Sequence, residues 1–116
     1  MRISVVLDCR EPDALVPFWS AALGYRLADA LGDYRVLVPA DGEAPGPALV
    51  LQRVPERRTG KNRMHVDVHP GDAAAHVERL EALGGRRLGG RVEEFDMWWQ
   101  VMADPEGNEL CVVAHP

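Results

Sequence analysis

Three side chains with the chemistry to bind a ligand occupy alternate positions near the middle of the chain. They are His65, Asp67 and His69. Apolar residues alternate with them: Met64, Val66 and Val68. A period of two is typical of a strand with two different faces, so we expect the imidazoles and the carboxylate to share one face. Imidazole exchanges a proton near neutral pH, which makes His65 the main candidate for a catalytic residue.

The same three residues allow two other interpretations. Imidazole and carboxylate are zinc ligands, so His65, Asp67 and His69 could together hold Zn²⁺. Against this, three ligands in one short run have no recognised spacing, and His69 borders the strand-breaking pair Pro70-Gly71. Alternatively, the polar face simply contacts solvent. The pattern alone leaves these alternatives open.

Two residues near the C-terminus are further candidates. Cys111 is a nucleophile if an imidazole activates its thiol, but its apolar surroundings favour a buried structural cysteine. Trp98 and Trp99 are adjacent on a predicted strand and must point to opposite faces. Trp99 shares its parity with Val101, and we expect it to be the inner indole, offering a stacking plane to an organic ligand.

Composition bounds the class of protein. The chain has 116 residues, 47% of them hydrophobic, and a formal net charge of −5, which is typical of one globular domain and argues against nucleic-acid or anionic-membrane partners. The N-terminal apolar run is too short for a secretory signal or a membrane span. With only two cysteines, we expect reduced thiols and a cytoplasmic location.

The rest of the chain contains elements that would position these residues. A strand-like run at 2–9 precedes an apolar helical stripe that ends at Gly24, and the strand around His65 precedes a helix that begins after Asp72 and ends at Gly84-Gly85. Three strands are expected after each helix. They fall at 25–30, 34–38 and 48–54 in the first half and at 86–92, 95–103 and 108–114 in the second half.

The two halves therefore repeat. Leu23-Gly24 is echoed by Leu83-Gly84, and both helices begin near an Asp. We predict a single domain, residues 1–116, built from two βαβββ modules at about 1–58 and 62–116. A ferredoxin-like sheet also fits the mixture of elements but would not require matching halves.

Three strings carry a resemblance over almost the whole chain: LDCREPDALVPFWSAALG at 7–24, KNRMHVDVH at 61–69 and WQVMADPEGNELCV at 99–112. They resemble the glyoxalase/bleomycin-resistance (vicinal oxygen chelate) superfamily, and in particular its small glyoxalase-like domain members. The resemblance implies an α+β fold, with two βαβββ modules forming a cupped open-barrel mixed sheet with helices outside. Ligands of metal-binding members would fall on Ser4, Gln52, His65 and Cys111. The last position is normally Glu, so its replacement by Cys111 argues against a metal.

We therefore expect a metal-independent protein that binds or converts a small organic ligand between the modules, with His65 as catalytic residue and no cofactor. The expected ligand-binding residues are Ser4, Gln52, Asp67, Trp99 and Cys111. The alternatives are a metal-dependent lyase, isomerase or dioxygenase holding an ion such as Zn²⁺, an antibiotic-sequestering resistance protein, or an interaction module with a filled cup. The resemblance also implies a homodimer.

Overall fold

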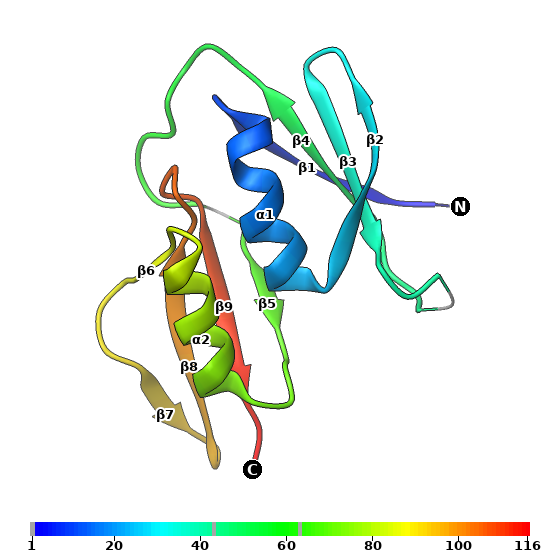
Figure 1. Cartoon of the computed structure of the whole chain (residues 1–116). Helices are drawn as coiled ribbons and strands as arrows, with labels where there is room; N and C mark the ends of the chain where they lie inside the picture. The colour runs from blue at the N-terminus through cyan, green and yellow to red at the C-terminus, as the bar shows by residue number, and fades with distance from the viewer. Residues whose placement is uncertain (1, 43, 63) are drawn as a thin grey trace. The chain divides into compact units, whose positions relative to one another are not determined.

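The chain folds into two compact units, one ending at Arg58 and the other beginning at Thr59. The computed structural model describes residues 2–42, 44–62 and 64–116. In each unit, one helix packs on a mixed β sheet (Figure 1). None of the helices in the described part of the chain is long and apolar enough to cross a membrane.

The first unit is a four-stranded sheet with strand order β1-β4-β3-β2. Strands β1 and β4 run parallel, and the other neighbours are antiparallel. A parallel pair needs a crossover connection, which here includes the helix and the β2–β3 hairpin. The elements are β1 (Ser4–Cys9), α1 (Pro12–Leu23), β2 (Tyr25–Leu31), β3 (Tyr34–Pro39) and β4 (Ala48–Arg53).

Helix α1 covers one face of this sheet because its apolar residues recur at helical spacing. Leu15, Phe18 and Trp19 are buried against β2, β3 and β4. The helix begins with Pro12 in its first turn, where a missing N–H costs nothing, and ends at Gly24, whose φ of +69° favours glycine. The face opposite α1 is left open and carries the even-numbered residues of β1 and β4.

The second unit repeats this plan with strand order β5-β9-β8-β6, and with β7 also paired to β8. Strands β5 and β9 are parallel, like β1 and β4 in the first unit. Its elements are β5 (Val66–Val68), α2 (Ala73–Ala82), β6 (Arg86–Arg87), β7 (Val92–Glu94), β8 (Met97–Ala103) and β9 (Glu109–Ala114).

Helix α2 covers one face of this second sheet. Asp72 caps its N-terminus by accepting a hydrogen bond from the Ala75 N–H at 3.0 Å. At the other end, Gly84 has a φ of +94°, and the Gly85 N–H donates to the Leu80 carbonyl at 2.9 Å, as in a Schellman motif. The buried residues of α2 and β9 meet on this face: Val77, Leu80, Leu110 and Val112.

The predicted fold class is confirmed: an α+β chain with two βαβββ-type modules and mixed sheets. Two local predictions were wrong. The strand expected at 86–92 is split into β6 and β7, because Gly89 adopts a φ of +72° between them. Met64, expected on the buried face, lies outside β5 and is 83% exposed.

Candidate functional site

Asp67 and Cys111 lie directly opposite one another on the parallel strands β5 and β9. In a parallel pair, residues at the same level share a face, and α2 packs on the other face through Leu110 and Val112. His65 precedes β5 by one residue and has the parity of Asp67. The strand alternation therefore places the three side chains on the open face of the second sheet.

The structure brings these three side chains within contact distance. His65 Nε2 lies 3.1 Å from Asp67 Oδ1. One potential metal-ligand atom from each of His65, Asp67 and Cys111 lies within 4.8 Å of the other two. Cys111 is buried, whereas the side chains of His65 and Asp67 are about half exposed. The third member of the zinc-type group is thus Cys111 rather than His69.

The Cys111 thiol is protonated at neutral pH. Burial raises its pKa to about 11, and the negative charge of Asp67 and its hydrogen bond to the thiol add to this effect, as does Glu109. Lys61 acts in the opposite direction. Because the thiolate is the nucleophilic form, Cys111 is not an activated nucleophile in this environment. Both cysteines of the chain are free thiols.

These side chains line an open pocket of about 370 Å³ in the second unit. Two further imidazoles lie in it: His69 Nδ1 is 2.8 Å from His115 Nε2, and the rings stack with centroids 5.0 Å apart. Apolar contact surface comes from the remaining lining residues, Met97, Trp99 and Val113. The pocket therefore combines a few polar groups with an aromatic and aliphatic wall, as small-molecule sites do.

The two adjacent tryptophans point to opposite faces. Trp99 pairs with Val113 on β9 and lines the pocket. Trp98 has the opposite parity, and the Arg91 guanidinium carbon lies 4.7 Å from its ring centroid. Trp99 is consequently the indole that a ligand in this pocket would contact.

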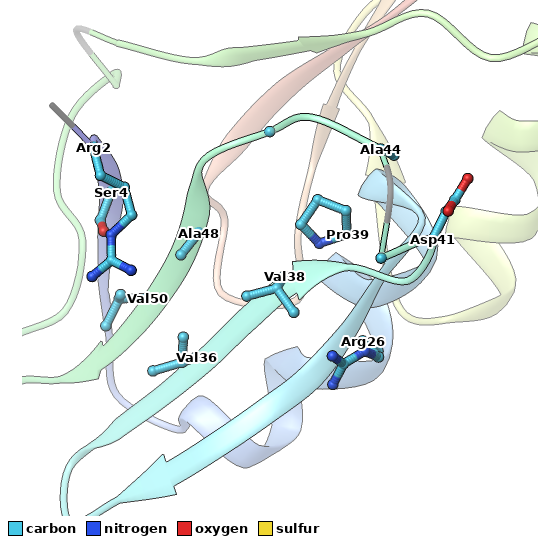
Figure 2. Close-up of a pocket in the computed structure, with 12 residues that line it drawn as sticks. Arg2, Ser4, Arg26, Val36, Val38, Pro39, Asp41, Ala44, Ala48 and Val50 are labelled. Carbon is cyan, nitrogen blue, oxygen red and sulfur yellow. The ribbon is translucent and has the colours of Figure 1, made fainter.

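Ser4 lies in the first unit, on the face of the sheet that α1 leaves open. An open pocket of about 530 Å³ lies over this face. Figure 2 shows Arg2 on one side of the pocket and Arg26 on the other. Four small apolar side chains lie between them: Val36, Val38, Ala48 and Val50. Asp41 also lines the pocket, on the loop after β3.

The two guanidiniums give this first pocket a chemical preference. Within the described residues, neither Arg2 nor Arg26 has an ion-pair partner. Guanidinium binds carboxylate and phosphate groups by paired hydrogen bonds, and the valines offer an apolar floor. An organic molecule with an acidic group matches this surface.

The position of Gln52 tests the four-residue metal set that the resemblance implies. Ser4 pairs with Ala48, whereas Gln52 pairs with Asp8 at the other end of β1. Four residues along a strand span about 13 Å. One ion needs all its ligand atoms within bonding distance, about 2–2.6 Å, so Ser4 and Gln52 cannot both ligate the same ion. Hydroxyl and amide groups are also poor ligands for such an ion. The four residues do not fit a shared metal.

Sequence reasoning missed four polar lining residues of these pockets: Arg2, Arg26, Asp41 and His115. His115 lies just beyond β9 and shares the parity of Cys111 and Val113, which was the available signal. Nothing in the sequence pattern distinguishes Arg2 and Arg26 from other exposed arginines.

The comparisons with known proteins agree with this fold. The model of the glyoxalase-like domain family matches residues 4–113, so the chain belongs to this family. A search of the curated proteins finds no match.

Several solved structures share the fold at low sequence identity. A glyoxalase/bleomycin resistance protein/dioxygenase family enzyme from Burkholderia phytofirmans PsJN is 14% identical, with a TM-score of 0.76 and 97% of each chain covered. A glyoxalase/bleomycin resistance protein/dioxygenase from Nocardioides is 19% identical, with a TM-score of 0.72, covering 99% of this chain and 83% of the other. A bleomycin-binding protein in complex with bleomycin is 14% identical, with a TM-score of 0.69, covering 100% of this chain and 99% of the other.

Proposed function

We propose that this glyoxalase-like domain binds a small organic molecule in the pocket of its second unit, with His65 as the polar anchor and Trp99 as the stacking plane. The observation that carries the proposal is the composition of one pocket, where imidazole, carboxylate, thiol and indole groups line the same space. The bleomycin-binding relative, solved with its ligand, supports a binding role for this fold.

His65 also has the arrangement of a general base. Its Nε2 lies 3.1 Å from an Asp67 carboxylate oxygen, and the carboxylate can only accept a hydrogen bond. Nε2 therefore carries the proton in the neutral ring, and Nδ1 keeps its lone pair. A ligand with an acidic C–H or O–H within about 3 Å of Nδ1 would transfer its proton there. A sequestering protein would use the same pocket without this step.

The proposal does not use the metal ion of the superfamily pattern, because Ser4 and Gln52 lie too far apart to share one. Binding without a metal ion therefore remains our expectation, and the geometry argues only against an ion shared by Ser4 and Gln52. A homodimer and a cytoplasmic location remain predictions from the sequence and the resemblance.

A thermal-shift screen tests the proposal. The protein is kept in chelator and mixed with a panel of aromatic, acidic and cationic organic compounds, and binding to the folded state raises the Tm. We expect at least one compound to raise the Tm of the wild type. The affinity for this compound should fall about tenfold in His65→Ala and in Trp99→Phe. Trp98→Phe is the matched control and should leave binding unchanged. A panel without any stabilising compound, or hits indifferent to both pocket substitutions, would contradict the proposal.

A further inference from the structure

The geometry points to a second ligand site in the first unit, one that takes an organic diacid: two carboxylate or phosphate groups joined by a short apolar chain. Its parts are Arg2 and Arg26, which bind the two acidic groups, and the apolar sheet surface between them. All the lining residues belong to the first unit, so this diacid site is separate from the pocket to which the proposed function is assigned.

One row of residues runs across all four strands of the first sheet, on the face that α1 leaves open. Arg26 on β2 lies opposite Val38 on β3, and Ser4 on β1 lies opposite Ala48 on β4. The antiparallel register of β3 and β4 brings the two central members, Val38 and Ala48, level with each other. Neighbouring strands lie about 4.8 Å apart, so three gaps separate the ends of the row by about 14 Å. The sheet therefore holds Arg26 and Ser4 at opposite ends of an apolar strip.

Arg2 supplies the cation at the β1 end of this row. It lies two residues before Ser4, the first residue of β1, and its side chain lines the same pocket. Figure 2 shows the guanidiniums of Arg2 and Arg26 on opposite sides of the pocket, with Val38 and Ala48 between them. This arrangement suits a ligand with an acidic group at each end, one for each guanidinium.

The chemistry of the lining defines the ligand class. Guanidinium binds carboxylate and phosphate groups by paired, charge-assisted hydrogen bonds, and the structure gives Arg2 and Arg26 no ion pair with another described residue. Val38 and Ala48 present methyl groups, against which a hydrocarbon spacer buries apolar surface. Asp41 is the acidic lining residue, and Figure 2 shows its carboxylate directed away from both guanidiniums. The two cations are thus available to a ligand.

The loop between β3 and β4 forms one wall of the pocket and is tied down at both ends. The Ala40 N–H donates to the Gly24 carbonyl at 3.0 Å, and the Tyr25 hydroxyl donates to the Pro47 carbonyl at 2.8 Å. Gly46 packs so closely on Tyr25 that an added methyl group would lie 2.6 Å from its hydroxyl oxygen. Both ends of the wall are therefore held by the turn between α1 and β2, and the wall belongs to the fold of the first unit.

Suberate and octanoate are the probes, because they share a chain of eight carbons and differ by one carboxylate. Isothermal titration of the full chain at neutral pH and low ionic strength measures the affinity for each acid. We expect suberate to bind at least about tenfold more tightly than octanoate, since its second carboxylate gains a second guanidinium partner. High salt should reduce this advantage, because exposed ion pairs are screened. Equal affinities for the two acids, or no binding of suberate, would overturn the inference.

Three variants locate the site. Arg2→Gln and Arg26→Gln each remove one guanidinium and keep a polar side chain, and each should weaken suberate binding about tenfold. Both arginines are exposed, so these variants are expected to fold. Arg57→Gln changes the net charge equally in the connector after β4 and should leave the affinity unchanged. Suberate binding that is indifferent to either pocket arginine, or that falls equally in Arg57→Gln, would contradict the assignment.

The diacid site and the proposed function can fail separately. Ligands of the second unit are recognised by their dependence on His65 and Trp99, whereas suberate is recognised by its dependence on Arg2 and Arg26. Suberate binding without any ligand for the second unit would leave the diacid site standing alone. Ligands that depend on Trp99, with no binding of suberate, would leave only the pocket of the second unit.

Discussion

Asp67 on β5 lies directly opposite Cys111 on β9, on the face of the second sheet that α2 leaves open. The first unit has the same register, with Asp8 opposite Gln52. The position two residues before each Asp is Val6 in the first unit and His65 in the second. The duplicated frame thus has an imidazole, a carboxylate and a thiol in one unit only, which is why the candidate chemistry belongs to the second unit.

Ionisation of Cys111 should make stability fall at high pH. The pKa of this thiol is about 11 in the folded chain against an ordinary 9.0, so the unfolded chain loses its proton first. The stabilisation is complete below pH 9 and is lost as the pH rises towards 11, by roughly 2–3 kcal/mol of unfolding free energy. Urea unfolding at several pH values should show this fall in the wild type. In Cys111→Ala, the unfolding free energy should fall by roughly 2–3 kcal/mol less over the same pH range. Equal pH dependence in both proteins would contradict the role given to the thiol.

Trp99 should report ligand binding through its fluorescence, because it lines the pocket of the second unit. Trp98 lies on the other face, beneath Arg91, and should not respond. Adding an organic compound that the thermal-shift screen identifies should change the emission of the wild type and of Trp98→Phe. The change should be mostly lost in Trp99→Phe. The reverse pattern would mean that the compound binds on the α2 side of the sheet.

Much of this fold could be predicted from the sequence, because local rules govern it. The alternation around Val66 and Val68, the cap at Asp72 and the glycine after Leu83 each predict one element, and all three are confirmed. The grouping of Asp67 with Cys111 was harder to predict. It depends on β9 returning beside β5 in parallel, and residues 44 positions apart acquire this contact only through tertiary structure.

His115 shows the other limit of local rules. The strand ends at Ala114, so the parity that His115 shares with Cys111 does not by itself establish which face its side chain occupies. Its contact with His69 places it in the pocket. For Met64 the periodicity predicts too much. The alternation continues through this residue, but the strand begins only at Val66.

The first pocket should prefer acidic ligands. Arg26→Gln removes one of its two guanidiniums, and a hydrogen bond to a charged group contributes about 1.5–3 kcal/mol. We expect compounds with a carboxylate or phosphate to bind about tenfold more weakly to this variant, with neutral compounds unaffected. Arg57→Gln is the matched control, because it changes the net charge equally in the connector outside the pocket. Equal losses in both variants would indicate a general charge effect; isothermal titration distinguishes the two.

The glycines that end the two helices should differ in their tolerance of a side chain. Both have positive φ, +69° at Gly24 and +94° at Gly84, so alanine is strained at each by about 1–2 kcal/mol. A methyl group at Gly24 meets nothing within 4 Å, whereas at Gly84 it would lie 3.2 Å from Pro105 Cγ. Gly84→Ala should therefore lower the unfolding free energy by about 1 kcal/mol more than Gly24→Ala. Urea unfolding followed by tryptophan fluorescence measures both, since Trp19 reports on the first unit and Trp98 and Trp99 on the second. Equal losses would show that the turn at Pro105 moves aside without cost.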